Sequence, residues 1–169
     1  MRKIVPAALA AALMTAAGAA NAATATTSFG VSATVLKACS VAASALAFGN
    51  YTPGAGNIAA NTAVNVNCTK GTTFTVALNG GTTTGGSISQ RLMTAGGADT
   101  LRYNLYTTAA LATLFGDGTT GSTMPGTGAG LAAANAVAVT VYGQVPDTAA
   151  NQAVTPGAYT DTIGVTVTY

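Results

Sequence analysis

Residue types that transfer protons or bind metal ions are scarce in this 169-residue chain. It contains no His and no Glu, and its only side-chain carboxylates belong to four aspartates. Without His, a Ser/His/Asp catalytic arrangement is excluded, and the commonest general acid, general base and metal ligand is missing. We therefore expect no enzymatic activity, no metal and no cofactor.

The four aspartates are predicted to have structural roles. Asp99, Asp117 and Asp147 lie in polar turn sequences, where an Asp side chain usually accepts hydrogen bonds from the backbone. Asp161 falls on the apolar face of the last predicted strand. Because a buried carboxylate needs hydrogen-bond partners, we expect Asp161 to be hydrogen-bonded at the rim of the fold.

The charge of the chain is low. Six Lys and Arg and four Asp give a net charge of +2, and 6% of the residues are charged, against about 25% in a typical soluble protein. Ala, Thr and Gly make up more than half of the sequence. Nucleic-acid binding lacks the basic surface that it requires, so no nucleic-acid partner is expected. This composition favours an extracellular structural protein.

The first 22 residues have the pattern of a secretory signal peptide. Arg2 and Lys3 precede an apolar run over 4–20, and Ala20-Asn21-Ala22 is a small-x-small cleavage site. The alternatives are a transmembrane helix or a buried helix, but the run is short for a span, contains Pro6 and lacks a cationic flank. Cleavage after Ala22 would leave four basic and four acidic side chains.

Two cysteines, Cys39 and Cys68, remain after such cleavage. In an exported protein an even number of cysteines suggests a disulfide. The alternative is a pair of reduced, buried thiols. A zinc site is excluded because no His and no further Cys could complete tetrahedral coordination.

Alternation of apolar and polar residues with period two dominates the chain after residue 22. It predicts strands over 25–35, 64–68, 74–78, 101–107 and 136–141, a short edge strand over 91–93 and a long strand over 159–169. We expect 74–78 to pair with 64–68 as a hairpin, 116–130 to be a loop and 132–134 to be a possible helix start. About seven strands without long helices indicate an antiparallel β-sandwich.

The first and last predicted strands have no evident partner. The last strand would end at the last residue and expose an open sheet edge unless something lies beside it. The first strand precedes Cys39 and is therefore free to leave its own domain and pair with another. The sequence permits such an exchange.

The chain resembles the spore coat U domain, the pilin domain of archaic chaperone-usher pili. The resemblance covers nearly all of 29–169 and has no clear pattern over 108–135. The segments that carry it are Cys39-Ser40-Val41, Leu46-Ala47-Phe48-Gly49-Asn50-Tyr51, Val64-Asn65-Val66-Asn67-Cys68, Phe74 to Gly81, Arg91-Leu92-Met93, Leu101 to Tyr106, Tyr142-Gly143 and Gly157 to Tyr169.

The resemblance implies an incomplete immunoglobulin-like antiparallel β-sandwich with an N-terminal donor strand. The domains would be a signal peptide (1–22), a donor-strand extension (23–36) and a pilin domain (37–169). The expected donor residues are Phe29, Val31, Ala33 and Val35, and one wall of the acceptor groove would consist of Ile163, Val165 and Val167.

The resemblance also implies a function and a set of partners. A periplasmic chaperone would lend the missing strand, and at the outer-membrane usher the extension of the next, identical or related subunit would replace it. The expected function is a structural pilus subunit, secreted through the periplasm to the cell surface and supporting attachment and biofilm formation. The alternatives are a secreted coat or matrix protein, or a carbohydrate-binding sandwich that uses Tyr51, Tyr103 or Tyr142.

Overall fold

The computed structural model describes residues 22–169, so the predicted signal peptide, apart from Ala22, lies outside the described residues. The chain divides into two units, one up to Thr34 and one from Val35 to Tyr169. In the first unit, residues 22–34 form no regular secondary structure, although the sequence predicts a strand over 25–35. Alternation alone does not make a strand, because an isolated extended segment has no neighbouring backbone to pair with.

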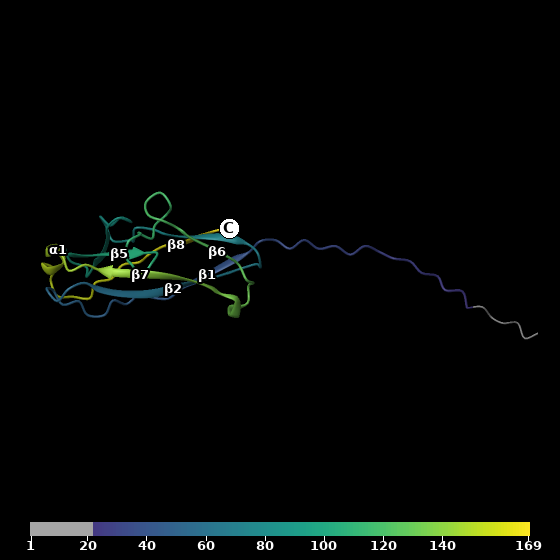
Figure 1. Ribbon diagram of the computed structural model, residues 1–169, viewed down its shortest axis with the longest axis horizontal. Coiled ribbons are helices and arrows are strands. Elements are labelled where there is room, and N and C mark those ends of the chain that lie inside the picture. Colours follow the sequence, from purple (N-terminus) through teal and green to yellow (C-terminus); the bar gives the residue numbers. More distant parts are fainter. Residues whose placement is uncertain (1–21) are drawn as a thin grey trace, which may run out of the picture. The chain divides into compact units, whose positions relative to one another are not determined.

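The second unit is a sandwich of two antiparallel sheets, as predicted (Figure 1). The five-stranded sheet has the spatial order β1 (Cys39–Ala43), β2 (Ile58–Cys68), β7 (Val137–Val145), β5 (Thr100–Tyr106) and β4 (Arg91–Thr94). The three-stranded sheet has the order β6 (Met124–Thr127), β3 (Thr73–Leu78) and β8 (Val165–Thr168). A 3₁₀ turn, η1 (Ala133–Asn135), precedes β7, and a short helix, α1 (Ala149–Gln152), follows it. Within residues 22–169, no helix has the length and apolar character needed to cross a membrane.

The core lies between the two sheets and is built from the inward-facing residues of alternating strands. Its buried apolar side chains are Val64, Val66, Cys68, Phe74, Val76, Leu78, Met93, Leu101, Tyr103, Leu105, Phe115, Val139, Val141 and Val145. Complete burial of one such Val, Leu or Phe side chain contributes about 1.5–3 kcal/mol. The period-two pattern of the sequence therefore selects the faces that hold the sandwich together.

A disulfide joins the first two strands. Cys39 and Cys68 lie directly opposite each other in the antiparallel register of β1 and β2, and their sulfur atoms are bonded. The expected disulfide is confirmed, and it attaches β1, an edge strand of the five-stranded sheet, to its neighbour.

The expected hairpin between 64–68 and 74–78 is wrong. β2 pairs with β1 on one side and β7 on the other, whereas β3 belongs to the opposite sheet, between β6 and β8. The turn at Gly71, which has a positive φ of 81°, carries the chain across the sandwich. Alternation shows that each segment buries one face, but it does not say which sheet the segment joins.

Two further strands differ from expectation. The segment 116–130 is not entirely a loop, because β6 pairs with β3, and Gly126 leaves room for the ring of Phe74. Of the long strand expected over 159–169, only β8 forms regular strand structure. The preceding segment, 159–164, still alternates between half-buried odd and exposed even positions, but its one bridge joins Thr160 to Thr94 of β4.

Replacing Cys39 and Cys68 together by Ser should lower the free energy of unfolding by about 3–4 kcal/mol, because the disulfide closes a loop of about 30 residues in the unfolded chain. Chemical denaturation of the oxidised protein and of the double variant measures the difference. A reductant should destabilise the wild type and leave the double variant unchanged; equal stability of the two oxidised proteins would contradict the expectation.

Candidate functional site

The sandwich is open along the side where β1 and β8 lie, since each is an edge strand of its sheet. β8 pairs with β3, and the Asn79 N–H donates to the Gly164 carbonyl at 3.1 Å. Because antiparallel hydrogen bonds alternate along a strand, the backbone N–H and C=O groups of Ile163, Val165 and Val167 point away from β3. Among the described residues, no strand pairs with this side of β8.

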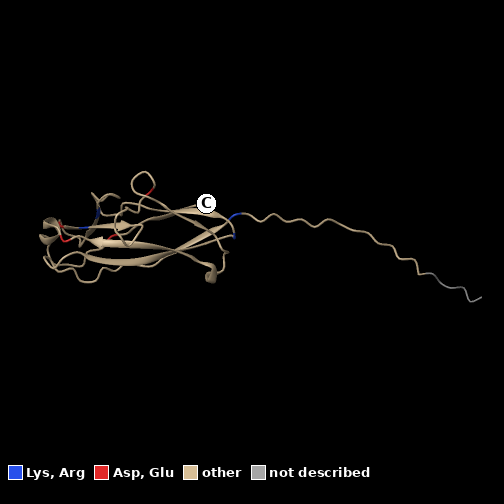
Figure 2. Ribbon diagram, viewed as in Figure 1, with Lys and Arg blue, Asp and Glu red and all other residues tan. Residues whose placement is uncertain are grey.

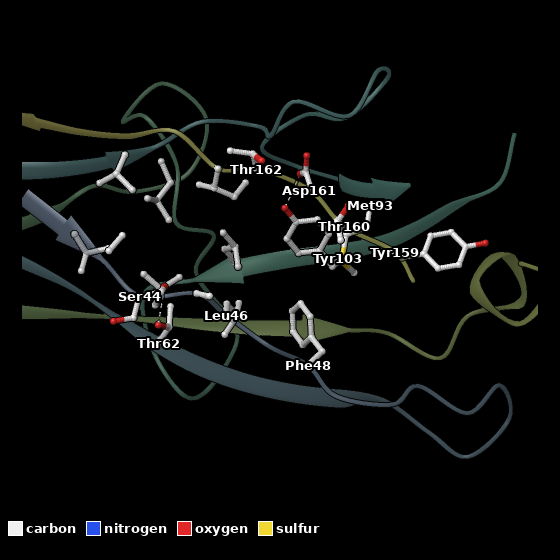
Figure 3. A pocket seen from close by; sticks show the side chains of 18 residues that line it. Ser44, Leu46, Phe48, Thr62, Met93, Tyr103, Tyr159, Thr160, Asp161 and Thr162 are labelled. Carbon is white, nitrogen blue, oxygen red and sulfur yellow. Dashed lines mark hydrogen bonds between the residues drawn. The ribbon is translucent and has the colours of Figure 1, made fainter. Parts of the chain in front are cut away.

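Two adjoining cavities follow this open side. One, of about 480 Å³, lies between segment 43–48, which begins at the last residue of β1, and segment 159–165, which ends in β8 (Figure 3). The other, of about 880 Å³, lies between 46–53 and 154–159. The two share the lining residues Leu46, Phe48, Met93 and Tyr159. We refer to them together as the edge groove.

The floor of the edge groove is made by core residues of both sheets. Val64, Leu78, Met93, Tyr103, Leu105 and Val141 line the first cavity, and Ile58, Leu101 and Val145 line the second. The groove therefore gives access to the hydrophobic core itself. An apolar occupant would bury its side chains there and be shielded from water.

One wall of the edge groove contains two of the three predicted acceptor residues. Ile163 and Val165 line it, whereas Val167 packs against the core beyond the cavities. Their role as acceptor residues stays a prediction. The predicted donor residues lie in exposed, irregular backbone: Phe29, Val31 and Val35 are 85–87% exposed, and Ala33 is also exposed.

The opposite wall contains Leu46 and Phe48, which sequence reasoning did not assign to the site. They lie over Gly143 of β7, where an added Cβ would come within 2.6 Å of Leu46 Cδ2 and 2.8 Å of Phe48 Cζ. The Phe48 ring also meets the ring of Tyr103 edge to face, with centroids 6.0 Å apart. A glycine inside a strand often marks a place where other groups come close to the backbone. Gly143 was therefore the feature of the sequence that could have indicated this contact.

Asp161 is hydrogen-bonded at the rim of the groove, as expected. Its carboxylate accepts from the Tyr103 hydroxyl at 2.7 Å and from the backbone N–H groups of Thr82 and Thr83 at 2.9 and 3.0 Å. Burial alone would raise the pKa of Asp161, but these hydrogen bonds lower the pKa below its ordinary value. Burial, followed by the bond to Asp161, raises the pKa of Tyr103.

Asp147 organises the far end of the groove. It accepts hydrogen bonds from the Tyr51 hydroxyl and from the N–H groups of Gly54 and Gly56, the latter two at 3.1 and 2.9 Å. The bond from Tyr51 is the main reason that the pKa of Asp147 falls to about 2. Desolvation and the same bond raise the pKa of Tyr51 to about 12. The pair thus stays in its hydrogen-bonded form across the neutral range.

Asp99 and Asp117 both accept hydrogen bonds from backbone N–H groups, as the sequence predicts, although the partner of Asp99 is 56 residues away and only Asp117 bonds within its own turn. Asp117 accepts from the N–H groups of Thr119 and Thr120, and Asp99 accepts from the Thr155 N–H. These backbone hydrogen bonds lower the pKa of both carboxyl groups. Charged residues are sparse along the described chain (Figure 2), and no group of three His, Cys, Asp or Glu residues there could hold a metal ion.

The three tyrosines considered for carbohydrate binding do not form one surface. Tyr103 is buried and bonded to Asp161, while Tyr51 is bonded to Asp147. Tyr142 alternates with the buried residues of β7 and therefore lies on the outer face of the five-stranded sheet, opposite Tyr106. Tyr142 and Tyr103 lie on opposite faces of the same sheet and therefore cannot belong to one sugar site.

Fold and groove define an antiparallel immunoglobulin-like sandwich that is open along one edge. The sequence family described as Spore Coat Protein U domain matches residues 25–166, and the chain belongs to this family. No curated protein matches the sequence.

Among solved structures, the fold is similar to a chain in the crystal structure of the CsuC–CsuE chaperone–tip adhesion subunit pre-assembly complex from archaic chaperone-usher Csu pili of Acinetobacter baumannii. The TM-score is 0.55 and the sequence identity 22%, and the match covers 80% of the present chain and 40% of the other. The present chain thus matches less than half of its neighbour's length.

Stability should decrease on acidification between about pH 4 and pH 2, partly through Asp147. The pKa of this carboxyl is about 2 in the folded state, below its ordinary value of 3.8. The ionised carboxylate therefore stabilises the fold at pH values above 3.8, and this stabilisation is lost as the pH falls toward about 2. Unfolding free energies of the wild type and Asp147→Asn over this range measure the effect. Parallel pH profiles for the two proteins would contradict it.

Proposed function

We propose that the chain is a structural pilus subunit that polymerises by donor-strand exchange. One observation carries the proposal: the chain contains both an apolar groove at an unpaired sheet edge and an exposed segment with alternating apolar residues. In the proposed assembly, residues 23–36 of each incoming subunit occupy the edge groove of the subunit before it. Before assembly, a strand lent by a periplasmic chaperone occupies the same groove.

The chemistry of the groove suits an added strand. The outward-pointing N–H and C=O groups of Ile163, Val165 and Val167 provide a ladder for a neighbouring backbone, and the apolar floor accepts alternate side chains. Strand addition combines these two kinds of contact. Burial of the expected donor residues Phe29, Val31 and Val35, with the smaller Ala33, would contribute on the order of 6–10 kcal/mol before the costs of ordering.

Donor and groove are different surfaces of the same chain, so the proposed contact is head-to-tail. Such a contact builds a filament when its rotation does not close into a ring. The similar solved structure is a complex of a chaperone with a pilus tip subunit, and together with the family assignment this supports a chaperone-usher pathway that ends at an outer-membrane usher. Attachment and biofilm formation by the resulting surface pilus complete the proposal.

Export is the first step of this proposed pathway. The predicted signal peptide, residues 1–22, would direct the chain out of the cytoplasm and be removed. The Cys39–Cys68 disulfide supports this route, since such bonds form and persist in oxidising compartments such as the periplasm. The assigned role is structural and requires no catalytic group.

The decisive variant pair is Val31→Asp against Ser32→Asp in the mature chain, residues 23–169. Val31 lies on the predicted apolar face of the donor segment and Ser32 on the opposite face. A charge at position 31 would have to enter the apolar groove, at a cost that prevents insertion, whereas a charge at position 32 would stay in water. Electron microscopy and size-exclusion chromatography should show fibres for Ser32→Asp and none for Val31→Asp.

Deletion of residues 23–35 provides the control for folding. The shortened chain should form no fibres but should still co-purify with the periplasmic chaperone, because the groove is retained. Fibres of ordinary length from the shortened chain or from Val31→Asp would contradict the proposal.

A further inference from the structure

The walls of the edge groove are not regular strands. Residues 44–57 on one side and 154–164 on the other contain no β-strand, and the bridge between Thr160 and Thr94 is the one pairing of this kind within them. Irregular segments with few ladder bonds open easily. Something other than strand pairing must therefore fix the width of the groove when no strand lies in it.

On the C-terminal wall, Asp161 makes the principal attachment. Besides the Tyr103 hydroxyl and the two backbone N–H groups, the hydroxyls of Thr82 and Thr83 donate to it at 3.2 and 3.0 Å. Gly81, at a φ of 91°, approaches the carboxylate so closely that a Cβ would clash with it. Figure 3 shows the bond from Tyr103 crossing from the groove floor to the wall. The wall is thereby joined to β5 and to the loop that follows β3.

A buried arginine fixes the backbone next to this attachment. Arg91 is completely buried, and its guanidinium donates to the carbonyls of Asn79, Ile88 and Phe115. The Asn79 side-chain oxygen in turn accepts from the Gly164 N–H at 2.8 Å. Besides the bridge from Thr160 to Thr94, the C-terminal wall is therefore held at Asp161 and Gly164 by groups that belong to the sandwich and not to any occupant of the groove.

On the N-terminal wall, Asp147 has the equivalent position. It follows β7, a central strand, and bonds to Tyr51, Gly54 and Gly56, while its own N–H donates to Asn57 Oδ1 at 2.7 Å. The loop 51–57 is thus attached to the end of the core sheet. At each wall an aspartate accepts a hydrogen bond from a tyrosine hydroxyl, Asp147 from Tyr51 and Asp161 from Tyr103.

We propose that the pairs Tyr51–Asp147 and Tyr103–Asp161 are positioning residues that keep the vacant edge groove open and thereby set the rate of strand capture. The inference rests on the proposed function, which supplies the strand, residues 23–36 of another copy. Preorganisation acts by reducing the ordering that binding would otherwise require. Since the bonds within both pairs form without an occupant, they favour the capture step more than the retention of a captured strand.

The test compares Tyr51→Phe and Tyr103→Phe with the wild-type mature chain. A fluorescent synthetic peptide of residues 23–36 is mixed in excess with each protein, and its association and dissociation rates are followed by stopped-flow and displacement. We expect each variant to associate about tenfold more slowly, which corresponds to about 1.4 kcal/mol and is the size of effect expected when a hydrogen bond to a charged group is lost. Dissociation should change by less than about twofold.

Two controls separate positioning from general destabilisation. Tyr142→Phe removes a hydroxyl from the outer sheet face, and Asp117→Asn removes a turn-capping charge away from the groove; both should capture the peptide at the wild-type rate. In hydrogen exchange, amides of 51–57 in Tyr51→Phe and of 159–164 in Tyr103→Phe should exchange faster, with β2 and β7 unchanged. If Tyr103→Phe does not fold, the double variant Thr82→Val and Thr83→Val replaces it.

The outcomes are distinct. Wild-type association rates in both tyrosine variants, or an equal slowing in Tyr142→Phe, would overturn the inference and leave the proposed function intact. Failure of the wild-type chain to capture the peptide at all would overturn the proposed function and the inference together. Slower association with local loosening of the matching wall supports both.

Discussion

The unsatisfied backbone edge of β8 is the constraint on which the rest of the structure depends. A strand needs hydrogen-bonding partners on both sides unless water or another chain supplies them, and β8 has a strand partner only in β3 among the described residues. The same edge borders an opening into the core, lined by Ile163 and Val165. An additional strand with alternating apolar side chains would therefore pair with the free backbone edge and cover the opening into the core at the same time. The exposed segment around Phe29 and Val31 has this pattern.

The scarcity of charge fits this arrangement. Apolar floor residues such as Leu105 and Val141 offer no partner for a charged ligand, so an occupant has to be recognised through its backbone and its shape. Three of the four aspartates instead make contacts at the walls of the groove: Asp147 accepts from Tyr51, Asp99 accepts from the Thr155 N–H, and Asp161, within the wall, accepts from Tyr103. On the side of the groove opposite β8, the disulfide holds the edge strand β1 against β2. Polar and covalent contacts thus fix the rim, and the floor of the groove remains apolar.

Local patterns predict much of the fold because a sandwich buries alternate residues. The pattern locates the core of β2, β3, β5 and β7, and an even number of cysteines indicates the disulfide. It does not reveal that β3 joins the other sheet, because sheet membership depends on long-range pairing. Nor does spacing bring Tyr51 to Asp147 or Tyr103 to Asp161, which are 96 and 58 residues apart. Arg91 resembles an ordinary polar residue of an edge strand, yet the carbonyls that surround it come from three separate positions.

The most direct measurement of strand exchange between copies is photo-cross-linking from position 29 within fibres. Phe29 is replaced by benzoylphenylalanine, and isotopically heavy and light subunits are mixed before assembly, so that mass spectrometry distinguishes links between copies from links within one. We expect cross-links from position 29 to groove residues in 43–53 or 154–165 of a different subunit. Cross-links confined to a single chain, or to the outer faces of the sheets, would contradict donor-strand exchange.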